Sequence, residues 1–167
     1  RAGTFQVERF SAMVGPADRV DAGYALGRAL MRMYAGDGRV LRGLARSVLT
    51  GPSVRRRDID FAYEAAQAAD AIGKGEDPKA LEVLGLAWFA KGDRDKAIGF
   101  VERARKIETE RKFQKQYERT LAHFRKDPPG PMPPFVPPSG GKPAAAPVPG
   151  ATTTVPPAGA GGSADGG

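Results

Sequence analysis

The sequence contains no cysteine, and only one of its 167 residues, His123, is a histidine. Without cysteine the chain cannot form a disulfide, bind a metal through thiolates or use a thiol as a nucleophile. A single histidine argues against a histidine-rich metal site and against a serine–histidine–aspartate triad. Apolar runs are short as well, and none approaches the roughly 18–20 residues that cross a bilayer. We therefore expect no catalytic residue, no metal, no cofactor and no transmembrane segment in this chain.

The chain carries more basic than acidic side chains, 26 lysines and arginines against 19 aspartates and glutamates, for a formal net charge of +7. Basic residues gather at positions 55–57 and over residues 91–126, where they could attract a phosphate backbone or an anionic membrane surface. In residues 91–126, however, acidic residues are interleaved with the basic ones, and no nucleic-acid recognition motif accompanies them. Electrostatic binding of nucleic acid or membrane is therefore only an alternative, and nucleic acid is not the expected partner.

The composition changes abruptly at residue 127. Residues 128–167 contain 12 prolines and 9 glycines but only two charged residues, and their few large apolar side chains are isolated between prolines. Such a segment buries too little apolar surface to offset about 1–2 kcal/mol of backbone entropy per ordered residue. We expect residues 127–167 to be a disordered Pro/Gly/Ala-rich tail. Its P-x-x-P spacings could be read by an SH3-type groove, but a passive tether is the simpler interpretation.

Residues 17–126 predict an all-α domain, because apolar residues recur with helical spacing and no segment alternates in the manner of a strand. Turns that contain glycine or proline separate the periodic segments. About five or six helices are expected, and residues 1–16 form either a linker or an N-terminal helix. The six periodic segments are 18–34, 39–49, 59–72, 78–92, 94–107 and 110–126.

Three aspartates stand where a helix needs an N-cap. Asp58 precedes the segment 59–72, Asp77 precedes Pro78, and Asp93 precedes the segment 94–107. An aspartate carboxylate accepts hydrogen bonds from the unpaired N–H groups of a first helical turn, and proline is well tolerated at the first helical position. We therefore interpret these three aspartates as helix caps.

The fourth and fifth periodic segments share a spaced pattern of large and small residues, Leu81-x-x-Leu84-Gly85-x-x-Trp88-x-x-x-Gly92-x-x-x-x-Ala97-x-x-x-Val101-x-x-Ala104. This pattern resembles the 34-residue helix–turn–helix signature of the tetratricopeptide repeat (TPR). In that arrangement Gly85 and Ala97 lie where the two helices touch, and Gly92 allows the tight turn between them. The resemblance implies a short antiparallel helical array that binds a protein or peptide partner.

The repeat organisation that follows from this resemblance has one good and one degenerate unit. Residues 78–109 form the best repeat, and residues 38–74 form a degenerate repeat whose loop at 51–57 is too long for a regular unit. Residues 110–126 then form the capping helix that such arrays require, so that the TPR-like domain spans 17–126. An ordinary helical bundle with the same spacing by chance is the alternative.

A second resemblance covers about half of the chain. The motifs that carry it are Leu41-x-x-Leu44-Ala45, Arg57-Asp58-Ile59-Asp60-x-Ala62-x-x-Ala65-Ala66, Gly75-Glu76-Asp77-Pro78 and Lys91-Gly92-Asp93-x-x-Lys96-Ala97. They resemble the C-terminal helical extension of secreted bacterial thioredoxin-like (redoxin) proteins. Since the redox motif of that family needs two cysteines, the resemblance implies that this chain is the non-catalytic part of a larger redoxin-like protein.

This second resemblance also bears on partners and location. It implies an upstream redoxin domain on the same polypeptide as one partner, and the periplasm or cell envelope as the location; without it, a cytoplasmic location is expected. The alternative function is that of an accessory domain in a thiol–disulfide oxidoreductase whose catalytic domain lies upstream.

Helical repeats usually bind partners on the face formed by their first helices. On that face we expect Arg39, Arg42 and Arg46, spaced i, i+3 and i+7, where three guanidinium groups could hold an acidic peptide. A solvated helix surface is the alternative interpretation of these arginines. The good repeat contributes Lys79, Glu82, Leu86 and Phe89, of which Leu86 and Phe89 line an apolar part of the groove or pack against a neighbouring helix.

Overall fold

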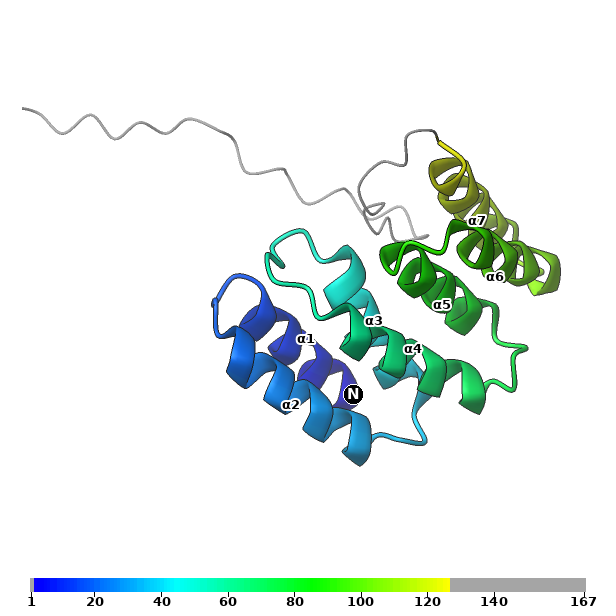
Figure 1. The fold of residues 1–167 in the computed structure, drawn as a ribbon. Coiled ribbons are helices and arrows are strands. Elements are labelled where there is room, and N and C mark those ends of the chain that lie inside the picture. Colours follow the sequence, from blue (N-terminus) through cyan, green and yellow to red (C-terminus); the bar gives the residue numbers. More distant parts are fainter. Residues whose placement is uncertain (1, 127–167) are drawn as a thin grey trace, which may run out of the picture.

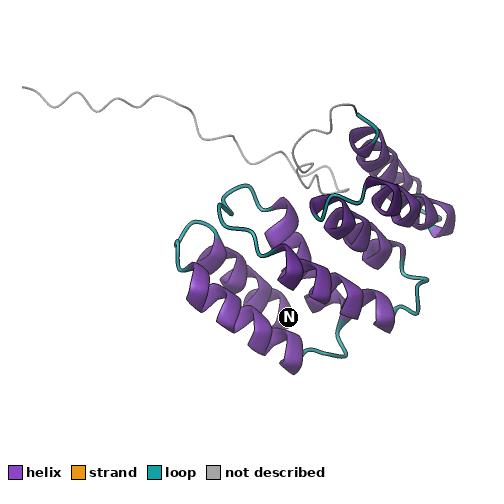
Figure 2. Cartoon of the chain, in the orientation of Figure 1, coloured by secondary structure: helices purple, strands orange, loops and turns teal. Residues whose placement is uncertain are grey.

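The computed structural model describes residues 2–126, and within them the chain is all-α with seven helices and no strand (Figures 1 and 2). The all-α prediction is confirmed for this part of the chain, and the predicted disordered tail at 127–167 lies outside it. The number of helices exceeds the expected five or six because the N-terminal segment is helical rather than a linker. The helices are α1 (Ala2–Val14), α2 (Val20–Met33), α3 (Gly38–Thr50), α4 (Ile59–Ile72), α5 (Pro78–Ala90), α6 (Arg94–Ile107) and α7 (Arg111–Phe124).

The helices form three successive pairs, α1/α2, α3/α4 and α5/α6, followed by α7, which packs on α6 (Figure 1). The first helices of the pairs touch one another, since α3 packs against both α1 and α5, whereas α4 and α6 make little backbone contact. The array is therefore tighter on the side of α1, α3 and α5 than on the side of α4 and α6. None of the helices in residues 2–126 is long and apolar enough to cross a bilayer.

Local sequence signals account for most helix boundaries. The carboxylates of Asp58, Asp77 and Asp93 accept hydrogen bonds from backbone N–H groups of the first turns of α4, α5 and α6, so the three predicted caps are confirmed. The last helix begins later than expected, at Arg111. The reason is Glu108, whose carboxylate accepts hydrogen bonds from the backbone N–H groups of the next two residues at 3.0 Å each and holds the chain out of a helix there.

The predicted contact between α5 and α6 depends on two glycines. A Cβ added at Gly85 would lie 2.6 Å from Cγ2 of Val101 and 3.0 Å from the carbonyl oxygen of Ala97, so only glycine lets the helices approach this closely. Gly92 has a φ of +87°, which the turn between the helices requires. Trp88 is only partly buried, at the edge of the core rather than inside it. The other residues of the repeat signature are buried: Leu81, Leu84, Ala97, Val101 and Ala104.

Helix α1 is packed into the same core as α2 to α4. The rings of Phe10, Tyr24 and Phe61 lie 5.5–6.0 Å apart between their centroids. A Cβ at Gly27 would meet the rings of Phe10 and Phe61 at 2.7 Å, so α2 also approaches its neighbours through a glycine. The helical unit therefore reaches to Ala2 among the described residues.

Candidate functional site

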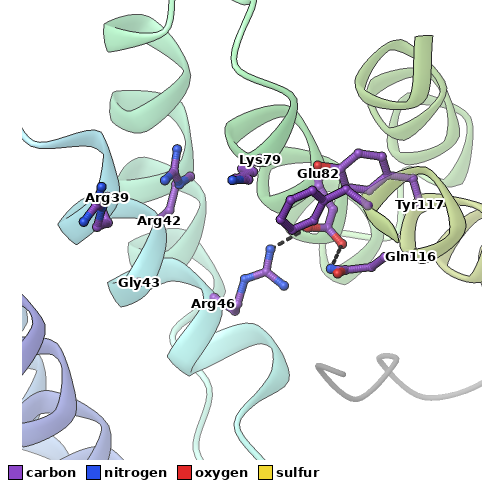
Figure 3. A pocket seen from close by; sticks show the side chains of 9 residues that line it. Arg39, Arg42, Gly43, Arg46, Lys79, Glu82, Gln116 and Tyr117 are labelled. Atoms are coloured by element: carbon purple, nitrogen blue, oxygen red, sulfur yellow. Dashed lines mark hydrogen bonds and ion pairs between the residues drawn. The ribbon is translucent and has the colours of Figure 1, made fainter. Parts of the chain in front are cut away.

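A groove of about 280 Å³ opens where α3, α5 and α7 meet (Figure 3). We call it the cationic groove, since it contains four basic side chains and only one acidic side chain. Five of the seven residues expected in a partner groove line it, namely Arg39, Arg42, Arg46, Lys79 and Glu82. The remaining lining residues are Gly43 of α3 and Phe113, Gln116 and Tyr117 of α7.

Glu82 lies at the inner end of the groove and is a buried acceptor. Its side chain is 4% exposed, and its Oε2 lies 2.6 Å from Nη2 of Arg46, which is 19% exposed. Nε2 of Gln116 donates a second hydrogen bond, 2.8 Å long, to Oε1 of Glu82 (Figure 3). A buried carboxylate needs such partners. Arg46 therefore stabilises the fold by joining α3 to α5, and Gln116 does the same by joining α5 to α7.

Arg42 is also engaged within the molecule. Its guanidinium donates a hydrogen bond to the carboxylate of Asp77, the residue that caps α5. The contact links α3 to the first turn of α5 and compensates part of the positive charge of the groove.

Arg39 and Lys79 differ from the other two basic residues of the cationic groove. The guanidinium of Arg39 is exposed and makes no hydrogen bond or ion pair with any residue in 2–126, and Lys79 forms no ion pair there. Nζ of Lys79 lies 4.3 Å from the centroid of the Phe113 ring, a cation–π contact. The side chains of Arg39, Arg42 and Lys79 stand beside one another in Figure 3. Two cations are therefore available to a ligand.

Helix α7 supplies the apolar wall of the cationic groove, which the sequence analysis did not assign to it. Phe113 is partly buried and Tyr117 is fully buried. Burial raises the pKa of the Tyr117 phenol, and the nearby carboxylates of Glu82 and Glu108 raise it further, so the hydroxyl stays neutral. The signal that could have located this wall is the apolar stripe of Phe113 and Tyr117 at spacing i, i+4.

Leu86 and Phe89 do not line the groove. They follow the alternative expectation, which was packing against neighbouring helices. Leu86 is 2% exposed. The ring of Phe89 stacks on that of Phe124 with centroids 4.4 Å apart, and His123 lies edge-on to it at 5.9 Å. Helix α7 thus packs against Phe89 at the C-terminal end of α5.

A shallow depression of about 610 Å³ continues the cationic groove toward α1. The two share Arg39, Arg42 and Gly43, so they form one surface that crosses α3. On the far side the depression is lined by Val7 of α1 and Ile72 of α4. The depression also contains the carboxylates of Asp37 and Asp77, so the surface is cationic on α3 and mixed in character toward α1.

The arginines of the loop at 55–57 differ in their contacts. Arg57 donates hydrogen bonds to the carbonyl oxygens of Val48 and Gly51, and burial lowers the pKa of its guanidinium. Arg56 forms an ion pair of 2.8 Å with Asp21. Arg57 thus holds the loop in place, whereas the side chains of Arg55 and Arg56 are exposed.

Residues 2–126 contain no group of three or more histidine, aspartate or glutamate side chains arranged to hold a metal ion. No protein-family model, no curated protein and no solved structure matches the chain. The interpretation of the cationic groove therefore rests on its own shape, charge and internal contacts.

Proposed function

We propose that this chain is a non-catalytic protein-interaction module of the TPR type, and that it binds an acidic peptide segment of its partner in the cationic groove. The observation that carries the proposal is the unpaired guanidinium of Arg39 in the same groove as Arg42 and Lys79, of which Lys79 lies against the ring of Phe113. Like charges held side by side repel one another, and a carboxylate placed among them relieves that repulsion.

The chemistry of the cationic groove favours a carboxylate-bearing peptide over a lone anion. A guanidinium binds a carboxylate through two parallel hydrogen bonds, and Arg39 has all of its side-chain donors available. The Phe113 ring beside Lys79 offers apolar surface to the neighbouring side chain of a peptide. The first helices of helical repeats commonly carry such sites, which agrees with the position of this groove on α3 and α5.

The proposal extends to the polypeptide from which the module comes. The resemblance to redoxin extensions supports a larger redoxin-like protein in which this chain is the C-terminal part and either recruits a partner or docks on the upstream domain. The alternative is an accessory role in a thiol–disulfide oxidoreductase. The reading frame upstream of Arg1 tests both: a thioredoxin-like domain with a C-x-x-C motif is expected, and its absence would contradict the redoxin assignment.

Calorimetric titration tests the peptide site directly. A peptide with two glutamates flanking a leucine is expected to bind, and its glutamine counterpart is expected to bind much more weakly. Arg39→Glu should weaken binding of the acidic peptide roughly tenfold or more, since a hydrogen-bonded charge pair becomes a repulsion. The matched control is Arg32→Glu, which makes the same charge change at an exposed position on α2. Equal losses of affinity in both variants would show that net charge alone determines binding, and would overturn the groove assignment.

A further inference from the structure

The depression that continues the cationic groove toward α1 carries no net charge, unlike the groove itself. Its charged side chains are those of Arg39 and Arg42 and those of Asp37 and Asp77, two of each sign. The cationic groove contains four basic side chains and one acidic side chain. An anionic group therefore gains attraction in the groove but little in the depression. We call this second surface the α1/α3 depression.

Both carboxylates of the α1/α3 depression already have partners within the domain. Oδ1 of Asp37 accepts hydrogen bonds from the backbone N–H groups of Arg39 and Val40, at 3.0 and 3.2 Å. Asp77 caps α5 and accepts a hydrogen bond from the guanidinium of Arg42. Neither carboxylate therefore needs a cationic ligand, and the depression favours an uncharged group.

Apolar side chains from two other helices line the far side of the α1/α3 depression. Ile72, the last residue of α4, is 41% exposed, and Val7 of α1 is partly buried. An aliphatic side chain laid against them would remove apolar surface of both partners from water, which is favourable in proportion to the area buried.

No side chain separates the cationic groove from the α1/α3 depression at Gly43, which lines both. A Cβ there would lie 3.0 Å from Cγ1 of Val7, so glycine lets α1 approach α3 and leaves the passage open (Figure 3 shows Gly43 on α3). Arg39 also lines both surfaces. In an extended peptide, residues two apart point to the same side and lie about 7 Å from each other. A peptide that crosses α3 thus presents one side chain to each surface.

We propose that the α1/α3 depression binds an uncharged aliphatic side chain of the partner peptide, two residues from the acidic residue held in the cationic groove. This inference rests on the proposed function and specifies its partner, an acidic segment with leucine, isoleucine or valine at that spacing. The acid supplies the charge attraction, and the aliphatic side chain covers Val7 and Ile72.

Three blocked peptides of one design test the spacing, acetyl-X-Ala-Glu-Leu-Glu-Ala-X-amide, in which X is leucine, alanine or glutamate. Residue X stands two positions from a glutamate at both ends, so the test holds for either direction of the bound peptide. In calorimetry the leucine peptide should bind roughly fivefold more tightly than the alanine peptide, since its larger side chain is buried in part. The glutamate peptide should bind more weakly than the leucine peptide, although it carries more negative charge. Equal affinities of the leucine and alanine peptides, or tightest binding of the glutamate peptide, would overturn the inference.

Two matched isoleucine variants locate the contact. Ile72→Ser should lower the preference for leucine over alanine to roughly twofold or less, as a double-mutant cycle measures. Ile107→Ser changes the last residue of α6, which is 37% exposed and lines neither surface, and should leave the preference unchanged. Equal preferences in the two variants would refute the placement of the aliphatic side chain.

Arg39→Glu separates this inference from the proposed function. It should weaken binding of all three peptides roughly tenfold or more. If it does so while the leucine and alanine peptides bind equally, the acidic-peptide site stands and only the aliphatic subsite fails. If it weakens none of the peptides, the proposed function fails and the subsite fails with it.

Discussion

Two glycine-to-alanine substitutions, one in each helix of the α5/α6 pair, test the close contact between these helices. Gly85 of α5 faces α6, and a Cβ there would lie 2.6 Å from Cγ2 of Val101 and 3.0 Å from the carbonyl oxygen of Ala97. Gly99 of α6 is exposed, and a Cβ there would meet nothing within 4 Å. Both positions are interior to a helix, so alanine improves the intrinsic helix propensity of each equally.

The expected magnitudes follow from this difference. Gly99→Ala should raise the free energy of unfolding by about 0.5–1 kcal/mol, since only the helix propensity changes. Gly85→Ala gains the same amount and loses about 1–3 kcal/mol to overpacking, because a backbone carbonyl cannot move aside as a flexible side chain can. The free energies of unfolding of the two variants should thus differ by about 1–3 kcal/mol, with Gly85→Ala the less stable. For a domain of this size, that difference corresponds to about 3–15 °C in Tm.

Urea unfolding followed by circular dichroism measures the two free energies, and differential scanning calorimetry measures the two Tm values. The slope of the urea dependence should be unchanged, since the surface exposed on unfolding is the same. Equal stabilisation by both substitutions would refute the contact at Gly85 and, with it, the helix pairing that the repeat signature predicts.

Three further predictions concern charged side chains. Glu82→Ala should lower the free energy of unfolding by about 3–5 kcal/mol, measured by urea denaturation, because it removes a buried carboxylate that accepts hydrogen bonds from both Arg46 and Gln116. Asp58→Ala should cost about 1 kcal/mol through loss of the α4 cap, and Asp58→Asn, which can still cap, should cost much less. Asp70→Asn should stabilise the fold at neutral pH, since burial raises the pKa of this carboxyl and its charge is unfavourable in the folded state. That gain is present above the folded-state pKa and should vanish as the pH falls below the unfolded-state value, where Asp70 is protonated in both states; a pH-independent gain would contradict it.

Local signals in the sequence were sufficient for much of the fold. The segments 59–72 and 94–107 coincide with α4 and α6, and each begins directly after a capping aspartate. The row of Arg39, Arg42 and Arg46 was predicted from its helical spacing, and all three side chains line the cationic groove.

The remaining features depend on contacts between segments far apart in the chain. Nothing near Phe89 in the sequence indicates that α7 folds back and stacks the ring of Phe124 on it. The burial of Glu82 results from Arg46 and Gln116, which are 36 and 34 residues away. The packing of α1 into the core likewise depends on glycines of α2, and the sequence alone does not indicate which residues those glycines contact.

Amide chemical-shift mapping with the acidic peptide tests the central claim, that the chain binds an acidic segment where α3, α5 and α7 meet. The largest changes are expected at Arg39, Lys79 and Gln116 and their neighbours, and they should disappear in Arg39→Glu but persist in Arg32→Glu. Changes centred instead on the arginine loop at 55–57 or on the basic surface of α6, and unaffected by Arg39→Glu, would contradict the account.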